Sequence, residues 1–137
     1  MNRFLIAQQN IYIKALDEIK KGRKRTHWMW FIFPQIHGLA MSNTAIKYEL
    51  KSVQEARDYF ANETLKARLI EISEAIYNLN GDIEYILDFP DNMKFKSCMT
   101  LFYLIAPEYK IFKNNLDRYF DGELCSHTLK IFNDENK

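Results

Sequence analysis

The chain has little of what marks secreted, metal-binding or membrane proteins. Only two of its 137 residues are cysteines, Cys98 and Cys125, and their separation fits neither a zinc motif nor a disulfide framework. No stretch approaches the roughly 18 uninterrupted apolar residues of a membrane-spanning helix, and the N-terminus has no leader pattern. We therefore expect a soluble cytoplasmic protein with reduced thiols, and neither a metal nor a cofactor.

Glycine and proline are also scarce, with four and three residues. No Gly/Ser/Pro-rich linker divides the chain, no internal repeat is present, and no hairpin dipeptide separates alternating runs. We expect a single domain over residues 1–137. Formal net charge is only +1, so the molecule as a whole lacks the field that attracts nucleic acid, and nucleic-acid binding is disfavoured.

What the chain does have is helical spacing of apolar residues. Residues 4–19 are predicted to form one amphipathic helix, ended by Gly22 in a left-handed conformation. The clearest stripe consists of Leu65, Leu69, Ile72, Ile76 and Leu79. Further helices are expected within 42–50, from Ser52, within 82–89, after Pro90, after Pro107 and from Ser126. Together these helices predict an all-α protein, a compact bundle of about six to eight helices of unequal length.

One block, residues 22–38, follows no period. Basic residues run into a segment that is wholly apolar from Trp28 to Phe33, whereas a strand would alternate and a surface helix would carry polar residues every turn. We expect this segment to be buried on several sides. Its polar edges either solvate the block or form the lip of a pocket.

No phosphate loop, dinucleotide-binding turn, zinc-protease or nucleophile-elbow motif occurs. The three histidines lack metal-site spacing. Two groups of residues instead combine cations with rings or hydroxyls, a combination suited to an anionic ligand with a flat ring. The candidate ligand-binding residues are Lys24, Arg25, His27, Trp28, Trp30 and Gln35 in the first group, and Lys94, Lys96, Ser97 and Thr100 in the second.

Each group also has a purely structural interpretation. The tryptophans can be core residues beside a solvated basic turn. The second group can be a solvated helix face on which Thr100 bonds back to its own backbone. The two interpretations differ in whether the polar groups of both segments face one cavity.

Three segments resemble an uncharacterised bacterial family known as domain of unknown function 1810. Residues 22–35 read GRKRTHWMWFIFPQ and are similar to the family block G-[KR]-K-[RS]-S/T-H-W-M-W-F-I-F-P-Q. Residues 91–102 resemble the family's D-x-x-K-x-x-S-S-M-T-L-F block. Residues 116–122, together with Thr128 and Leu129, resemble its closing L-D-x-Y-x-x-G…T-L pattern. The resemblance covers nearly the whole chain and implies a compact all-α bundle.

The resemblance implies no activity. Some members carry the label calpastatin, a protease inhibitor, but no extended inhibitory repeat is present here. Two positions depart from the family pattern: Ala40 stands for the second glycine of a G-L-G turn, and Cys98 stands for the second serine of S-S-M-T. A thiol is the weaker hydrogen bonder, which argues against a catalytic role at position 98.

Two functions stay open from the sequence. The first is a pocket that binds, and in one version processes, a small anionic ligand, namely a phosphorylated nucleotide-like molecule such as ADP-ribose or a conjugate of it. The second is a protein-interaction module without chemistry, in one version a homodimer. Whether the protein is an enzyme is left open.

Overall fold

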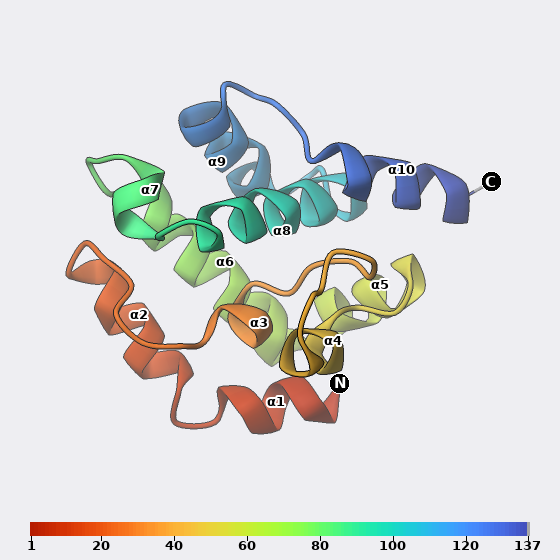
Figure 1. Cartoon of the computed structure of the whole chain (residues 1–137), viewed down its shortest axis with the longest axis horizontal. Coiled ribbons are helices and arrows are strands. Elements are labelled where there is room, and N and C mark those ends of the chain that lie inside the picture. Colours follow the sequence, from red (N-terminus) through yellow and green to blue (C-terminus); the bar gives the residue numbers. More distant parts are fainter. Residues whose placement is uncertain (137) are drawn as a thin grey trace.

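The computed structural model describes residues 1–136, and ten helices and no strand occur in that range. In chain order they are α1 (Asn2–Gln8), α2 (Tyr12–Lys20), α3 (Met29–Ile32), α4 (Asn43–Tyr48), α5 (Val53–Ala61), α6 (Glu63–Tyr77), α7 (Ile83–Ile86), α8 (Asp91–Ile105), α9 (Lys110–Phe120) and α10 (Ser126–Glu135) (Figure 1). The expected all-α class is confirmed, with more helices than the six to eight expected.

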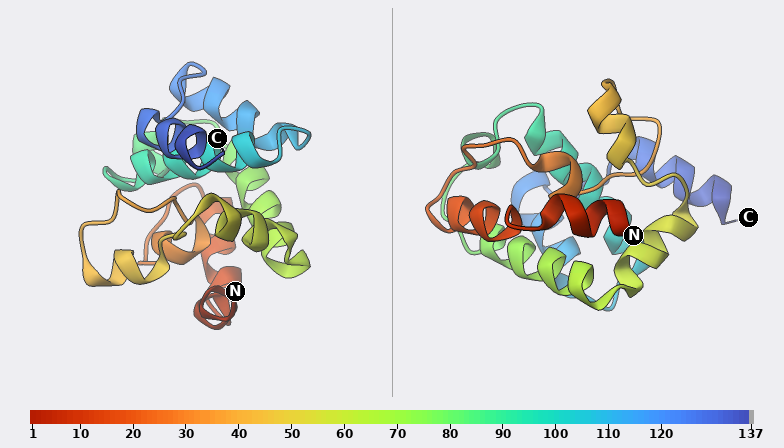
Figure 2. Two further views of the ribbon diagram at one scale, coloured as in Figure 1. Left: turned by 90° about the vertical axis from the view of Figure 1, so that its right-hand side faces the viewer. Right: turned by 90° about the horizontal axis from the view of Figure 1, so that it is seen from below.

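Two 15-residue helices, α6 and α8, hold the bundle together. Helix α6 packs against α2, α5 and α9, while α8 packs against α5, α7, α9 and α10. Figure 2 shows α9 and α10 on one side of this centre and α1 on the opposite side. The predicted stripe of α6 is confirmed, because Leu65, Leu69, Ile72 and Ile76 are all buried. No helix within residues 1–136 is both long and apolar enough to cross a bilayer.

The expectation of a single helix over residues 4–19 is wrong, because the chain breaks between α1 and α2 at Asn10, whose φ is +65°. Asparagine tolerates this left-handed conformation better than most residues. The break accompanies a buried amide, because Gln8 Nε2 donates to the carbonyl of Phe31 at 2.8 Å and to the Tyr59 hydroxyl at 3.1 Å. A buried amide requires such partners, and the sequence pattern does not show them.

Helix α2 ends at Lys20, and Gly22 terminates it in the left-handed conformation, as predicted. Gly22 has a φ of +102°, and its N–H donates to the carbonyl of Ile19 at 2.8 Å. The N–H of Arg23 donates to the carbonyl of Glu18 at 3.2 Å, which completes the paired hydrogen bonds of a Schellman ending. This ending turns the chain sharply into the basic and aromatic block.

The capping box expected at Ser52 forms only in part. The hydroxyl of Ser52 accepts the N–H of Glu55 at 3.0 Å and so caps α5. The Glu55 carboxylate does not return to Ser52. It accepts the N–H of Lys51 at 2.9 Å and pairs with Arg3 of α1 at 2.7 Å, which ties the first helix to the fifth.

The wholly apolar segment of the block, residues 28–33, which we call the aromatic block, crosses the bundle. It forms one helical turn, α3, flanked by buried residues. Trp28 has no exposed surface and Phe33 is 1% exposed. The ring of Phe33 meets Phe95 of α8 edge-on, with centroids 5.1 Å apart. Trp30 faces another way and is only half-buried. The block is therefore core on one side and surface on the other.

Candidate functional site

A cavity of about 350 Å³ lies between the aromatic block, the loop of residues 39–42 and the first half of α8. We call it the Trp30 cavity. It is lined by Trp30, Gln35, Leu39, Ala40, Met41, Ser42, Ala45, Pro90, Met93, Lys94 and Ser97. Its size lies within the range of small-molecule sites, and its walls are mostly apolar with a few polar groups, as is typical of such sites.

Four of the predicted residues come together in this cavity: Trp30, Gln35, Lys94 and Ser97. Trp30 is held by α3. Gln35 is fixed through its backbone, because its carbonyl accepts the N–H of Leu50 at 2.9 Å. Lys94 and Ser97 lie one turn apart on α8. Segments far apart in the sequence thus supply a ring, an amide, an ammonium group and a hydroxyl to one space.

The ammonium group of Lys94 lies beside the ring of Trp30, with Nζ 5.3 Å from the ring centroid. It also lies 3.6 Å from Oδ1 of Asp91, while Nζ of Lys24 lies 2.9 Å from Oδ2 of the same carboxylate. One carboxylate therefore neutralises one of two lysines. A net positive charge remains at the first turn of α8, where the helix dipole also favours anions.

A second, smaller cavity of about 210 Å³ adjoins this pair, and we call it the Arg25 cavity. It is lined by Lys24, Arg25, His27, Asp88, Phe89 and Asp91. Three predicted residues, Lys24, Arg25 and His27, therefore lie here and not in the Trp30 cavity. The walls of the two cavities meet where Asp91 contacts Lys94.

Trp28, by contrast, reaches neither cavity. Its ring is wholly buried, and its Nε1–H donates to Oε1 of Glu18 at 2.9 Å. The structural interpretation therefore describes this tryptophan: it offers no exposed face on which a ligand could stack. The sequence does not reveal that Trp28 is buried, because every residue from Trp28 to Phe33 is apolar. No polar position in this segment indicates which side chains face solvent.

The carboxylate of Glu18 organises the turn that carries the cations. It accepts the N–H of Arg25 at 2.7 Å, the N–H of Thr26 at 3.0 Å and the Thr26 hydroxyl at 2.6 Å, besides Trp28. Burial by itself opposes ionisation of this group, but these hydrogen bonds outweigh it and lower the pKa of Glu18 to about 2. Sequence reasoning missed Glu18, which lies among other charged residues at the end of α2.

Lys96 and Thr100 are drawn away from the Trp30 cavity. Lys96 forms an ion pair with Glu123. Thr100 is fully buried, and its hydroxyl donates to the carbonyl of Lys96 at 2.8 Å, the back-bonded arrangement of the structural interpretation. The same hydroxyl accepts the N–H of Cys125 at 2.9 Å and so positions the start of α10.

Lys96 and Cys125 line a third cavity of about 590 Å³, which borders the Trp30 cavity at Leu39, Met93 and Ser97. The hydroxyl of Ser97 lies 3.2 Å from Sγ of Cys125. Burial would raise the pKa of this thiol, but hydrogen bonds from Ser97 and from the first residues of α10 lower it below the usual value. Ser97 is distant from Cys125 in sequence, whereas the other donors, His127 and Thr128, act through the start of α10 that follows the cysteine directly.

The loop that forms one wall of the Trp30 cavity is fastened to the last helix. Nε2 of His37 lies 2.7 Å from Oε2 of Glu135, and Nε2 of His127 lies 3.0 Å from the carbonyl oxygen of His37. Gly38 follows with a φ of +97°, and a Cβ there would come within 2.7 Å of His127. Residues 39–42 are thereby held over the cavity from α10.

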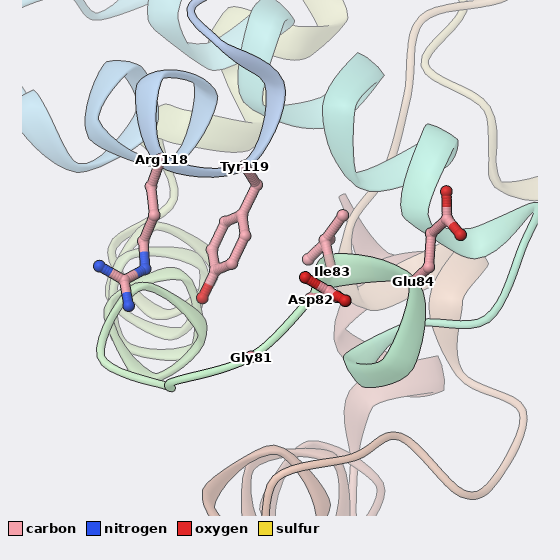
Figure 3. Close-up of a pocket in the computed structure, with 6 residues that line it drawn as sticks. All are labelled: Gly81, Asp82, Ile83, Glu84, Arg118 and Tyr119. Atoms are coloured by element: carbon pink, nitrogen blue, oxygen red, sulfur yellow. The ribbon is translucent and has the colours of Figure 1, made fainter.

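Another hollow, of about 580 Å³, lies between α9 and the α6–α7 connection (Figure 3). Figure 3 shows Arg118 and Tyr119 reaching from α9 toward this connection, with Glu84 pointing away from them. Arg118 donates to the carbonyl of Leu79 at 2.7 Å, and the Tyr119 hydroxyl donates to that of Ile76 at 2.6 Å. These contacts satisfy the end of α6, so the residues serve the fold.

The comparisons with known proteins agree with the fold. A family described as "Protein of unknown function (DUF1810)" matches residues 1–132. The chain is similar to the conserved hypothetical protein Rv1873 from Mycobacterium tuberculosis, which has a crystal structure. The two sequences are 37% identical, and the two structures superpose with a TM-score of 0.91 over 94% of this chain and 93% of that chain. No curated protein matches the chain.

Proposed function

Since the chain belongs to the DUF1810 family, whose description names no activity, we propose a function from its own geometry: the Trp30 cavity binds a small phosphorylated ligand with a flat ring. A nucleotide-like molecule such as ADP-ribose or a conjugate of it has this chemistry. The observation that carries the proposal is the position of Lys94, whose Nζ lies 5.3 Å from the Trp30 ring centroid at the wall of one cavity.

The division of polar and apolar groups supports this ligand class. The indole of Trp30 and the apolar side chains of Met41 and Met93 provide surface for a ring. The amide of Gln35 offers both a donor and an acceptor, and within residues 1–136 its side chain has no hydrogen-bond partner. Lys94 offers charge that Asp91 only partly neutralises. A flat, polar-edged ring joined to a phosphate satisfies all of these groups.

Binding is the core of the proposal, because no aspartate, glutamate, histidine or cysteine of residues 1–136 lines the Trp30 cavity. Asp91, whose carboxylate contacts the lining residue Lys94, is held in ion pairs by Lys24 and Lys94. A general acid or base would therefore have to come from the ligand or from Lys94. Turnover of an ADP-ribose conjugate would extend the proposal from binding to chemistry.

Titration calorimetry with adenosine, AMP, GMP and ADP-ribose tests the proposal. We expect the phosphorylated compounds to bind and adenosine to bind more weakly. Lys94→Met should weaken binding about tenfold or more, since hydrogen bonds to charged groups contribute roughly 1.5–3 kcal/mol. The matched control is Lys14→Met, because Lys14 is exposed on α2 and lines none of these cavities. Absence of binding by every compound at millimolar concentration would refute the proposal.

A second candidate, a protein-interaction surface, is favoured by exposed apolar side chains at the mouth of the same cavity. Met41 is 94% exposed and Met93 is 43% exposed, while Phe89, next to Pro90, is 76% exposed. Exposed apolar groups that gather in one place mark interaction sites. Light scattering tests self-association: a concentration-dependent dimer that Met41→Glu dissociates would favour this candidate, and a monomer at high concentration would oppose the homodimer.

A further inference from the structure

We propose that the ligand extends from the Trp30 cavity into the Arg25 cavity and carries a second phosphate there, so that the site selects a nucleoside diphosphate or a diphosphate-linked molecule over a mononucleotide. The proposal rests on the proposed function and adds Arg25 and His27 as residues that determine specificity. Lys24 and Lys94 would contact the two phosphates from either side.

The first support is the link between the two cavities. Asp91 receives Lys24 on one oxygen, at 2.9 Å, and Lys94 on the other, at 3.6 Å. A single carboxylate thus spans both ammonium groups, and a diphosphate is longer than a carboxylate, so it can reach both. The backbone between Phe89 and Pro90 joins the two walls, because Phe89 lines one cavity and Pro90 the other.

The second support is unused positive charge in the Arg25 cavity. Asp88, one of its two acids, pairs with Arg23 at 3.1 Å, outside the set of lining residues. Within residues 1–136, the side chains of Arg25 and His27 have no ion-pair or hydrogen-bond partner, and both are exposed. A guanidinium group matches the geometry of a phosphate and binds it through two parallel hydrogen bonds.

The third support is that the turn bearing these cations is rigidly held. Glu18 fixes the backbone of Arg25 and Thr26 through hydrogen bonds of 2.7 and 3.0 Å, and it fixes Trp28 through its indole. The backbone N–H of Lys24 donates to the carbonyl of Ile86 at 2.9 Å. The chain therefore presents the unpaired side chains of Arg25 and His27 on an ordered backbone, which lowers the entropy cost of binding.

The test compares two matched ligand pairs, AMP with ADP and GMP with GDP, by titration calorimetry on the whole chain. We expect the diphosphate of the pair that binds to be about tenfold tighter than its monophosphate, because it gains a charge-assisted contact. Arg25→Gln should remove this advantage by weakening the diphosphate much more than the monophosphate. His27→Gln should reduce it in the same selective way. Arg57→Gln is the matched control, since Arg57 is exposed on α5 and lines neither cavity.

The outcomes separate the two proposals. Equal affinity for mono- and diphosphates, or an equal loss of both with Arg25→Gln, would overturn the second phosphate site while leaving the Trp30 cavity as a ligand site. Absence of binding by all four nucleotides and by ADP-ribose would overturn both. Arg25 and His27 are exposed, so their variants should melt at the wild-type temperature, and a melting curve of each variant checks this.

Discussion

The indole Nε1–H of Trp28 donates to Oε1 of Glu18 at 2.9 Å, and this hydrogen bond joins the end of α2 to the start of the aromatic block. Glu18 is 8% exposed, so its charge lies where water hardly reaches it. It is kept there by four donors, three of them from Arg25 and Thr26. One carboxylate thereby fixes both the buried indole and the exposed basic turn.

Replacing this carboxylate should destabilise the fold. Glu18→Gln keeps the shape but loses the charge and presents an NH₂ group to donors. We expect a loss of about 1.5–3 kcal/mol in the free energy of unfolding, the range for hydrogen bonds to charged groups. Urea denaturation measures it, and Glu74→Gln, on the exposed face of α6, is the control. Equal midpoints for the two variants would contradict the role given to Glu18.

The same group predicts acid sensitivity. Its pKa is about 2 in the folded protein against an ordinary value of 4.5, so its contribution is complete above about pH 4.5 and is lost as the pH falls toward 2. At about 1.4 kcal/mol per pKa unit, the contribution is about 3 kcal/mol. Denaturation between about pH 6 and about pH 2.5 should show a shallower acid decline for Glu18→Gln than for the wild type. Parallel profiles would argue against this linkage.

The two thiols should differ sharply in reactivity. Burial raises the pKa of the fully buried Cys98 thiol well above its usual value, whereas the hydrogen bonds around Cys125 lower its pKa despite partial burial. Iodoacetamide at neutral pH should therefore label Cys125 and spare Cys98, because the thiolate is the nucleophile. Ser97→Ala should slow the labelling a few-fold. Peptide mass spectrometry reads both sites, and comparable labelling of Cys98 in the folded protein would refute the prediction.

Three glycine-to-alanine variants should rank in stability. Gly38→Ala combines a φ of +97° with a Cβ only 2.7 Å from Nε2 of His127, so we expect the largest loss. Gly22→Ala has a φ of +102° but open space, so it should lose only the conformational cost of about 1–2 kcal/mol. Gly81→Ala, with neither restriction, should be neutral or stabilising. Melting temperatures of the three variants give the order. A lower melting temperature for Gly81→Ala than for Gly38→Ala would contradict it.

Local signals predicted the elements of the fold well. The stripe from Leu65 to Ile76 and the helix end at Gly22 depend on near neighbours, so period and residue type suffice to place them. The break at Asn10 depends on where the amide of Gln8 finds its partners, Phe31 and Tyr59, which belong to other helices. Tertiary contacts of this kind leave no mark on local periodicity.

For the candidate site, the sequence predicted the residue types but not how they are arranged in space. The sequence placed cations and rings in the block and on α8, but it could not divide Trp28 from Trp30, which differ in exposure and not in type. Nor could it show that Lys24 and Lys94 share Asp91, since ion pairs between distant segments depend on the packed backbone. The geometry therefore reduces the candidate residues to two adjoining groups.

The edge-on packing of Phe33 against Phe95 also bears on how the protein is made. A chain that leaves the ribosome from its N-terminus presents Phe33 long before Phe95 exists, so the aromatic block has no partner from α8 during much of synthesis. Its apolar surface is then open to other nascent chains and to chaperones. Docking of α8 would bring the Phe95 ring against Phe33 and end that exposure.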